Sequence, residues 1–288
     1  MAIERMTVIG LGNMGGSVAL AVHRNPAADV EVVGYVRNEE AGREALRLDV
    51  VDRLSFDLAD AVHDADLVVL ATPVSAMESV MRHINPYLAK GAVVTDVGST
   101  KVEVNAWGRQ LIGHPAVFIG GHPMAGSAGS GLAGANGEVF RNTVFCVVGE
   151  ADTPKAASEA LLQLVQWIGA TPLLMTAQQH DDYVAHVSHL PMLLASALVT
   201  SVSTHEDWDV MSRLAALGFR EMTRSAAGSS EVRHSICRTN KAAIVASIDR
   251  FVGTLQQYRQ HIVQDDEQLL RLFQDARAAR RDWVNRRN

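Results

Sequence analysis

The segment from Ile119 to Gly131, IGGHPMAGSAGSG, surrounds a single histidine, His122, with residues that have almost no side chain. Histidine has an unperturbed pKa near ~6.5, so it can accept a proton at neutral pH. The small neighbours would leave room for a ring-shaped ligand against the backbone. The segment therefore predicts a general base beside a pocket, and a merely structural His-Pro turn is the alternative.

A second polar cluster, DVGSTK, places Asp96, Ser99 and Lys101 directly after another apolar run. Ligands of open α/β sheets bind beyond the carboxyl ends of the strands, and both segments are expected at that edge. If the two strands are neighbours, Ser99 and His122 meet at one site.

The motif GLGNMG near the N-terminus gives Gly10, Gly12 and Gly15 the G-x-G-x-x-G spacing, with Asn13 and Met14 between the last two glycines. Such glycines provide a tight turn, close approach of a pyrophosphate to the backbone, and close packing of helix on strand. The helix that follows offers its N-terminal N–H groups to phosphates. All five residues are predicted to bind a dinucleotide.

The choice of cofactor depends on the end of the second predicted strand, GYVRNEE. An NAD site has an acidic residue there, whereas this chain has Val36 followed by Arg37. An arginine suits the 2′-phosphate of NADP, so NADP is preferred over NAD; a solvated surface arginine is the alternative. Thr72 and Pro73, in ATPVSA, are expected to lie under the cofactor.

Strand-like and helical segments alternate through the first half of the chain, as in a parallel sheet covered on both faces. We predict a Rossmann-type, mostly parallel sheet domain over residues 1–174 and an all-helical domain over residues 175–288. The predicted strands lie in the segments RMTVIGLG, VEVVGYV, DLVVLATP, GAVVTDVG, AVFIGGHP, NTVFCVVGE and GATPLLMT.

The second half opens with HDDYVAHVSHLPMLLASALVTSV, which predicts one long apolar helix kinked at Pro191. Its apolar faces have no sheet to cover, so a homodimer is expected to bury them. This helix also carries His180, Asp181, His186 and His189, and His186 and His189 share one face. No cysteine cluster or glutamate pair joins them, so hydrogen bonding between helices and substrate contact are expected, and no metal is predicted.

Composition excludes several classes of protein. The 288 residues are 48% hydrophobic and 20% charged, with a net charge of −6, which does not fit a nucleic-acid-binding surface. The two cysteines are far apart, the N-terminus lacks the pattern of a signal peptide, and no apolar run approaches the ~18 residues of a membrane span. A cytoplasmic protein is expected.

Four motifs, DVGSTK, GGHPMAGS, HDDYVAHVSHLP and GFREMTR, resemble in their order the prephenate and arogenate dehydrogenases of tyrosine biosynthesis. The resemblance extends from the glycine motif to Thr239–Asn240. It implies a Rossmann domain followed by a helical dimerisation domain. It also implies oxidative decarboxylation of prephenate or arogenate to 4-hydroxyphenylpyruvate or tyrosine, with hydride transfer to NAD(P)+.

The resemblance also implies roles for individual residues. His122 resembles the catalytic histidine that accepts a hydrogen bond from the C4 hydroxyl of the substrate. Ser99 resembles the serine that positions that hydroxyl or the histidine, and His189 resembles a second, orienting histidine. Arg224 resembles an arginine that binds a substrate carboxylate, and Ser127 is expected to contact the substrate.

Three positions depart from the family pattern: Ala128, Met192 and Arg233 stand where the family often has glutamate, histidine and tryptophan. They leave the choice between prephenate and arogenate open. A β-hydroxyacid dehydrogenase is an alternative, but the long helix lacks the lysine that such enzymes use. A dinucleotide-sensing regulator is another, and it would not need Ser99, His122 and Arg224 together.

Overall fold

The computed structural model describes the chain apart from residues 1, 127–128, 130, 151 and 287–288. The described chain divides into two compact units, Met1–Lys241 and Ala242–Asn288. The domain boundary predicted near residue 174 falls between the last strand, which ends at Leu174, and the helix that begins at Ala177. This boundary remains a prediction.

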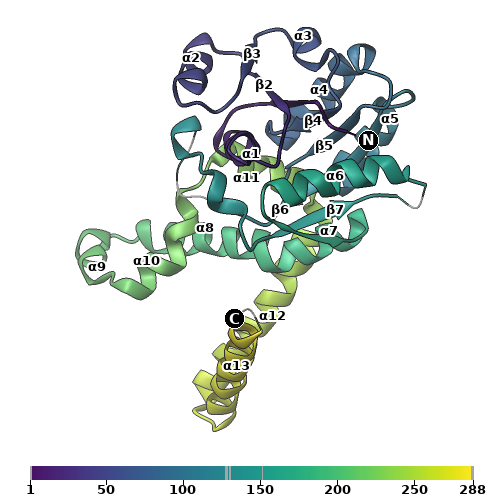
Figure 1. Ribbon diagram of the computed structural model, residues 1–288. Helices are drawn as coiled ribbons and strands as arrows, with labels where there is room; N and C mark the ends of the chain where they lie inside the picture. Colours follow the sequence, from purple (N-terminus) through teal and green to yellow (C-terminus); the bar gives the residue numbers. More distant parts are fainter. Residues whose placement is uncertain (1, 127–128, 130, 151, 287–288) are drawn as a thin grey trace. The chain divides into compact units, whose positions relative to one another are not determined.

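The first unit is built on one eight-stranded sheet with the strand order β3-β2-β1-β4-β5-β6-β7-β8 (Figure 1). Strands β1 to β6 are parallel, whereas β7 runs antiparallel to β6 and parallel to β8. This is the mostly parallel Rossmann-type sheet predicted from the sequence. The strands are β1 (Arg5–Ile9), β2 (Glu31–Tyr35), β3 (Arg53–Ser55), β4 (Leu67–Leu70), β5 (Val93–Asp96), β6 (Val117–Pro123), β7 (Val144–Val148) and β8 (Thr171–Leu174).

Helices cover both faces of the sheet, and each face has its own apolar cluster. One cluster includes side chains of α1 and α6, such as Val18 and Leu161, and the other includes side chains of α4 and α5, such as Met77 and Val104. Burial on both faces explains why the central strands are continuous apolar runs. The helices are α1 (Asn13–His23), α2 (Glu39–Arg47), α3 (Leu58–Val62), α4 (Val74–Ile84), α5 (Val102–Leu111) and α6 (Lys155–Trp167).

Two features of the sheet were not predicted. Strand β3 has only three residues and begins with a charged arginine, so it shows no hydrophobic period. The reversed direction of β7 is also invisible in its composition, because a strand buried on both faces has the same apolar pattern in either direction.

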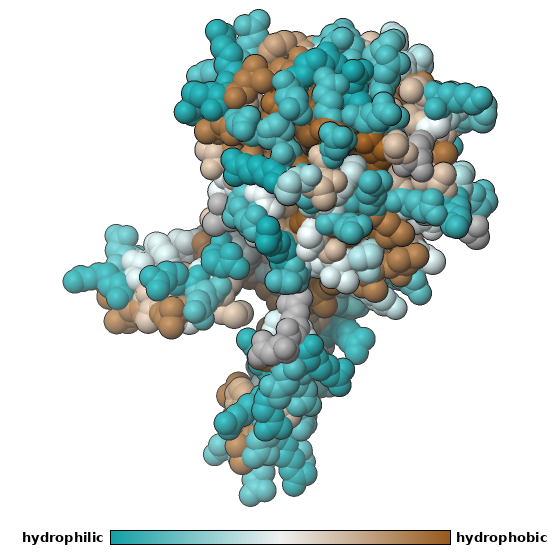
Figure 2. Space-filling view, viewed as in Figure 1, coloured by the Kyte–Doolittle hydropathy of each residue, from teal (hydrophilic) through white to brown (hydrophobic). Residues whose placement is uncertain are grey.

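After β8 the chain is helical, as predicted. The segments are α7 (Ala177–Val184), a π-helical turn (Ala185–His189), α8 (Leu190–Ser203), α9 (Trp208–Leu214), α10 (Leu217–Thr223), a 3-10 turn (Arg224–Ala227), α11 (Ser230–Thr239), α12 (Lys241–Gln264) and α13 (Gln268–Asn285). Exposed apolar side chains, among them Leu214, Leu217 and Met222, lie along the projecting α9–α10 segment (Figure 2).

The helix that begins the second half is interrupted by the π-helical turn just before Pro191. Proline has no N–H to donate to the carbonyl four residues earlier, so the regular helix cannot continue unchanged there. The wider π-helical turn accommodates the missing hydrogen bond. Such turns often occur at functional sites. This turn ends at His189, one of the predicted site residues.

The same helical stretch, Ala177–Ser203, is by length and composition apolar enough to cross a membrane, contrary to the expectation from the sequence. Its first turns nevertheless pack within the first unit. His180 and Asp181 are buried there and hydrogen-bonded to groups of the sheet domain.

Candidate active site

The glycine motif forms the turn between β1 and α1, and its three glycines have different surroundings. Gly10 has a positive φ of 100°, which favours glycine, and its N–H donates to the Tyr35 carbonyl. A Cβ on Gly15 would lie 2.7 Å from the Cβ of Ala71, so this glycine permits close packing of α1. A Cβ on Gly12 would meet nothing within 4 Å, so the backbone is open to a ligand there.

Two cavities border this turn. The outer cavity, of about 700 Å³, lies between the glycine turn and the end of β2, and it is bordered by Tyr35, Val36, Arg37 and Asn38. The inner cavity, of about 790 Å³, extends from the same turn to Ser99 and His122. Gly12, Thr72 and Pro73 border both cavities, which therefore form one groove along the carboxyl edge of the sheet.

This groove fits a dinucleotide. The outer cavity would hold the adenosine half, the open backbone at Gly12 and the start of α1 would face the pyrophosphate, and the inner cavity would hold the nicotinamide half. Met14 borders the inner cavity, and Arg37 borders the outer one. Gly15, which was also predicted to bind the dinucleotide, borders neither cavity and instead permits the close packing of α1.

Asn13 borders the inner cavity, and its side chain also forms hydrogen bonds to the loop that follows His122. Its amide nitrogen donates to the carbonyls of Gly129 and Gly134 at 3.1 and 3.2 Å. Asn13 thus ties the start of α1 to the loop that follows His122. Gly129 borders the inner cavity as well, so Asn13 holds part of the cavity's lining in place.

The inner cavity brings together Ser99, His122 and Arg224, which are far apart in the chain. Ser99 follows β5, His122 lies at the end of the neighbouring β6, and Arg224 begins the 3-10 turn after α10. The predicted substrate contact Ser127 lies outside the described residues.

The glycines that precede His122 serve the packing of the sheet. A Cβ on Gly121 would lie 2.5 Å from the Asp96 carbonyl oxygen and 2.9 Å from the Phe145 ring. A Cβ on Gly120 would meet the Asn105 amide. The expectation that these two glycines make room for a ligand is therefore wrong, whereas Gly126, beyond His122, faces open space.

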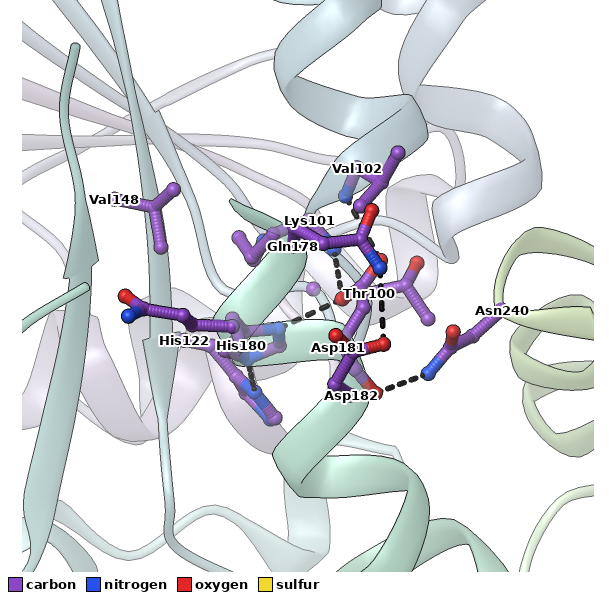
Figure 3. A network of polar contacts seen from close by, with 12 residues as sticks. Thr100, Lys101, Val102, His122, Val148, Gln178, His180, Asp181, Asp182 and Asn240 are labelled. Atoms are coloured by element: carbon purple, nitrogen blue, oxygen red, sulfur yellow. Dashed lines mark hydrogen bonds and ion pairs between the residues drawn. The ribbon is translucent and has the colours of Figure 1, made fainter. Parts of the chain in front are cut away.

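His122 is 8% exposed, and its Nδ1 lies 2.8 Å from Nε2 of His180 (Figure 3). His180 Nδ1 in turn lies 2.7 Å from Oδ1 of Asp181. Burial lowers the pKa of His122 well below its usual value, and the neighbouring His180 and Lys101 lower it further. His122 is therefore neutral at pH 7, as a hydrogen-bond acceptor or base must be.

His189 is also buried and neutral. Its Nδ1 lies 3.3 Å from the Asn240 side-chain amide, which also donates to the Asp181 carbonyl. Burial lowers the pKa of His189 to about 4, against the nearby charge of Asp181, which raises it. The Ser99 backbone also faces the His189 ring and raises its pKa, so His189 lies next to Ser99.

A fully buried ion pair lies at the end of β5, between Asp96 and Lys101. The Lys101 ammonium contacts the Asp96 carboxylate, which also accepts hydrogen bonds from the N–H groups of Gly98 and Gly121 at 2.8 and 3.1 Å. These contacts fix the backbone on either side of Ser99 and just before His122. A lone buried charge would be costly, and the pair avoids that cost.

The sequence predicted hydrogen bonding between helices or substrate contact for His180 and Asp181 but no link to His122, and it predicted no role for Asn240. The adjacent His-Asp pair was visible at the start of the long helix, but only the fold shows that it reaches His122. Arg233, noted as a departure from the family pattern, donates to the Ser196 hydroxyl and the Ala226 carbonyl at 3.0 and 2.9 Å. It therefore holds the turn that carries Arg224.

Comparison with known proteins identifies the family. The model of the prephenate dehydrogenase nucleotide-binding domain matches residues 18–174, and that of the prephenate dehydrogenase dimerization domain matches residues 176–275. The chain belongs to the prephenate dehydrogenase family. It is an NAD(P)-dependent dehydrogenase, and its helical half corresponds to the dimerization domain of this family.

Individual members of the prephenate dehydrogenase family agree with this assignment. The chain is 33% identical to the cyclohexadienyl dehydrogenase of Zymomonas mobilis over 281 residues, which is 96% of this chain and 95% of that protein. Among solved structures, A. aeolicus prephenate dehydrogenase, in complex with hydroxyphenyl propionate and NAD+, has a TM-score of 0.90 at 25% identity, covering 98% of this chain and 99% of that one. Synechocystis arogenate dehydrogenase has a TM-score of 0.81 at 28% identity, covering 97% and 99%.

Proposed function

We propose that the chain oxidises prephenate or arogenate, with loss of carbon dioxide, and that the reaction takes place in the inner cavity. The observation that carries this proposal is the meeting of Ser99, His122 and Arg224 around one cavity that continues into a dinucleotide groove. A hydroxyl, a neutral imidazole and a guanidinium match the alcohol and carboxylates of such a substrate.

His122 supplies the base in this proposal. A nicotinamide held in the inner cavity beside Gly12, Thr72 and Pro73 would supply the acceptor for the hydride that leaves C4 of the substrate ring. His122 Nε2 accepts the hydrogen bond, and then the proton, of the C4 hydroxyl as that carbon becomes a carbonyl. Loss of the ring carboxylate as CO2 returns an electron pair to the ring, and the proton goes back to the oxygen to give the phenol.

Arg224 holds a carboxylate in this proposal. Among the described residues no carboxylate pairs with its guanidinium, and Arg224 borders the same cavity as His122. A tight grip on the ring carboxylate would oppose its departure as neutral CO2, because only interactions that strengthen in the transition state accelerate a step. We therefore assign Arg224 to the side-chain carboxylate, which both substrates keep.

NADP+ is the proposed cofactor. The outer cavity has Val36 where an NAD site has an acidic residue, and the exposed Arg37 borders the same cavity. None of the described residues that line this cavity carries a carboxylate, so a 2′-phosphate can pair there with the Arg37 guanidinium.

A homodimer is also proposed. The helical half leaves large apolar side chains exposed: Leu214 is 79% exposed, Met222 64% and Leu217 57%. Exposed apolar surface of this kind marks a contact with another protein chain. Sedimentation should give about twice 31.1 kDa at micromolar concentration, and Leu214→Glu should shift the protein towards monomer. A monomeric, active wild-type protein would contradict the dimer.

A cytoplasmic location is proposed as well, and the two free thiols, Cys146 and Cys237, fit it.

The test of the function is absorbance at 340 nm with prephenate or arogenate and with NADP+ or NAD+. We expect reduction of the cofactor with at least one substrate, and a higher kcat/KM with NADP+. No reduction in any of the four combinations would refute the activity, and a higher kcat/KM with NAD+ would refute only the cofactor assignment.

A further inference from the structure

Behind His122 lie two buried polar side chains, those of His180 and Asp181, which the activity itself does not require to be polar. Asp181 is 1% exposed and His180 is 0% exposed, and they follow His122 in one hydrogen-bonded line (Figure 3). Asp181 and His180 lie on α7, so they reach His122 from the helical half of the chain. An apolar side chain could fill the same space, so the polar line needs an explanation.

The position of every proton in this line follows from its far end. Asp181 Oδ1 accepts the N–H of Lys101 at 2.7 Å, and its Oδ2 accepts the N–H of Val102 at 2.8 Å. These two N–H groups lie at the start of α5, so the carboxylate also caps that helix. A carboxylate held in this way can only accept, so His180 Nδ1 must carry the proton in their contact.

The proton on the His122 ring is fixed in the same way. The pKa of His180 is lowered by burial, so its ring is neutral and its Nε2, without a proton, accepts a hydrogen bond. His122 Nδ1 must donate that hydrogen bond and carries the proton of its own neutral ring. The only ring nitrogen of His122 left without a proton is Nε2. No described residue bonds this nitrogen, and His122 borders the inner cavity.

We propose that His180 and Asp181 are positioning residues that hold His122 in the tautomer with Nε2 unprotonated and facing the substrate. In the other tautomer Nε2 would carry a hydrogen and could not accept the C4 hydroxyl. This inference rests on the proposed function only for its effect on rate; the tautomer itself is a property of the protein without substrate.

The hydrogen bonds from His122 through His180 to Asp181 could instead transfer a proton away from the site, but the contacts of Asp181 do not fit that use. Both Asp181 oxygens already accept backbone N–H groups, and the carboxylate is enclosed, so a proton passed to it has no exit. The reaction also needs no exit, because the proton taken from the C4 hydroxyl returns to the phenol oxygen. The other charged groups facing the line are Lys101 and Asp96, which form the buried pair, and the neutral His189 lies beside it.

Two variants of His180 separate positioning from packing. His180→Gln keeps an oxygen acceptor near the place of Nε2, whereas His180→Phe keeps a ring of similar size without any nitrogen. We expect single-turnover hydride transfer to stay within about tenfold of wild type in His180→Gln and to fall by about 10²–10³ in His180→Phe. Asp182→Asn is the matched control for helix charge, because Asp182 bonds only Gln178 among the described residues; it should keep the wild-type rate.

The direct readout is the ¹⁵N NMR spectrum of the histidine rings, which distinguishes protonated from unprotonated ring nitrogens. Wild type and His180→Gln should show His122 with Nδ1 protonated and Nε2 unprotonated at pH 7, and His180→Phe should lose this preference. A protonated Nε2 in wild type, or a wild-type hydride-transfer rate in a folded His180→Phe, would overturn the proposal. If the expected tautomer is found but neither substrate is oxidised, the proposed function fails and the positioning of His122 stands.

Discussion

Two alanine substitutions in the glycine turn should have opposite consequences. Gly12 has φ −81° and ψ −161°, which any residue adopts, and a Cβ there meets no atom within 4 Å. Gly12→Ala should leave the free energy of unfolding unchanged or raise it by about 0.4–1 kcal/mol, by restricting the unfolded chain. The methyl group would, however, stand in the groove where the pyrophosphate approaches. Loss of one charge-assisted hydrogen bond, about 1.5–3 kcal/mol, would raise the Kd for NADP+ roughly 10–100-fold.

Gly15→Ala should instead destabilise the fold. Its Cβ would lie 2.7 Å from the Ala71 Cβ and would press on the backbone of Gly10, neither of which is a flexible side chain. Overpacking of this kind costs about 1–3 kcal/mol. Thermal unfolding without cofactor should show a Tm lower by roughly 2–4 °C for each kcal/mol.

Calorimetric unfolding and titration with NADP+ measure both effects on both variants. Wild-type affinity in Gly12→Ala would show that the phosphates do not lie over this turn. A wild-type Tm in Gly15→Ala would show that α1 can move away from β4, and the packing argument would fail.

Three further results are expected. Arg37→Ala should raise the Kd for NADP+ at least tenfold and leave that for NAD+ nearly unchanged, whereas equal changes would mean that Arg37 is only a surface residue. Arg224→Gln should raise KM at least tenfold and lower kcat less, because a charge-assisted pair is worth about 2–5 kcal/mol; a collapse of kcat at constant KM would contradict the assignment to the side-chain carboxylate. The pKa of His189 is about 4 in the folded protein and ~6.5 in the unfolded chain, so the unfolded state binds more protons between these values, and stability is lost as the pH falls through this window. Urea titrations should show about 1.4 kcal/mol less stability per pH unit from this residue, and a folded His189→Gln with an unchanged pH dependence would refute its neutral, buried state.

The fold and the main parts of the site could be predicted because their signals are local. The glycine spacing, the apolar strands and the residues after each strand place Gly12, Ser99 and His122 at one edge of the sheet. Arg224 was assigned by resemblance, since nothing near it in the sequence points to the cavity.

What could not be predicted depends on contacts between distant segments. Asp181 caps α5, 79 residues earlier in the chain, and His180 meets His122 only because α7 packs against that helix. The glycines before His122 were assigned to ligand space, whereas the structure places Asp96 and Phe145 against Gly121. A sequence pattern shows that a side chain is missing, but only the fold shows what occupies the space.

The role of His122 as the base is tested by single-turnover hydride transfer in His122→Asn, followed at 340 nm with saturating cofactor and substrate. Asparagine keeps a polar group at the end of β6 but provides no basic nitrogen. We expect a rate lower by about 10²–10⁴, with the wild-type Kd for the cofactor and the wild-type Tm. A rate near that of wild type in the folded variant would mean that His122 is not the base.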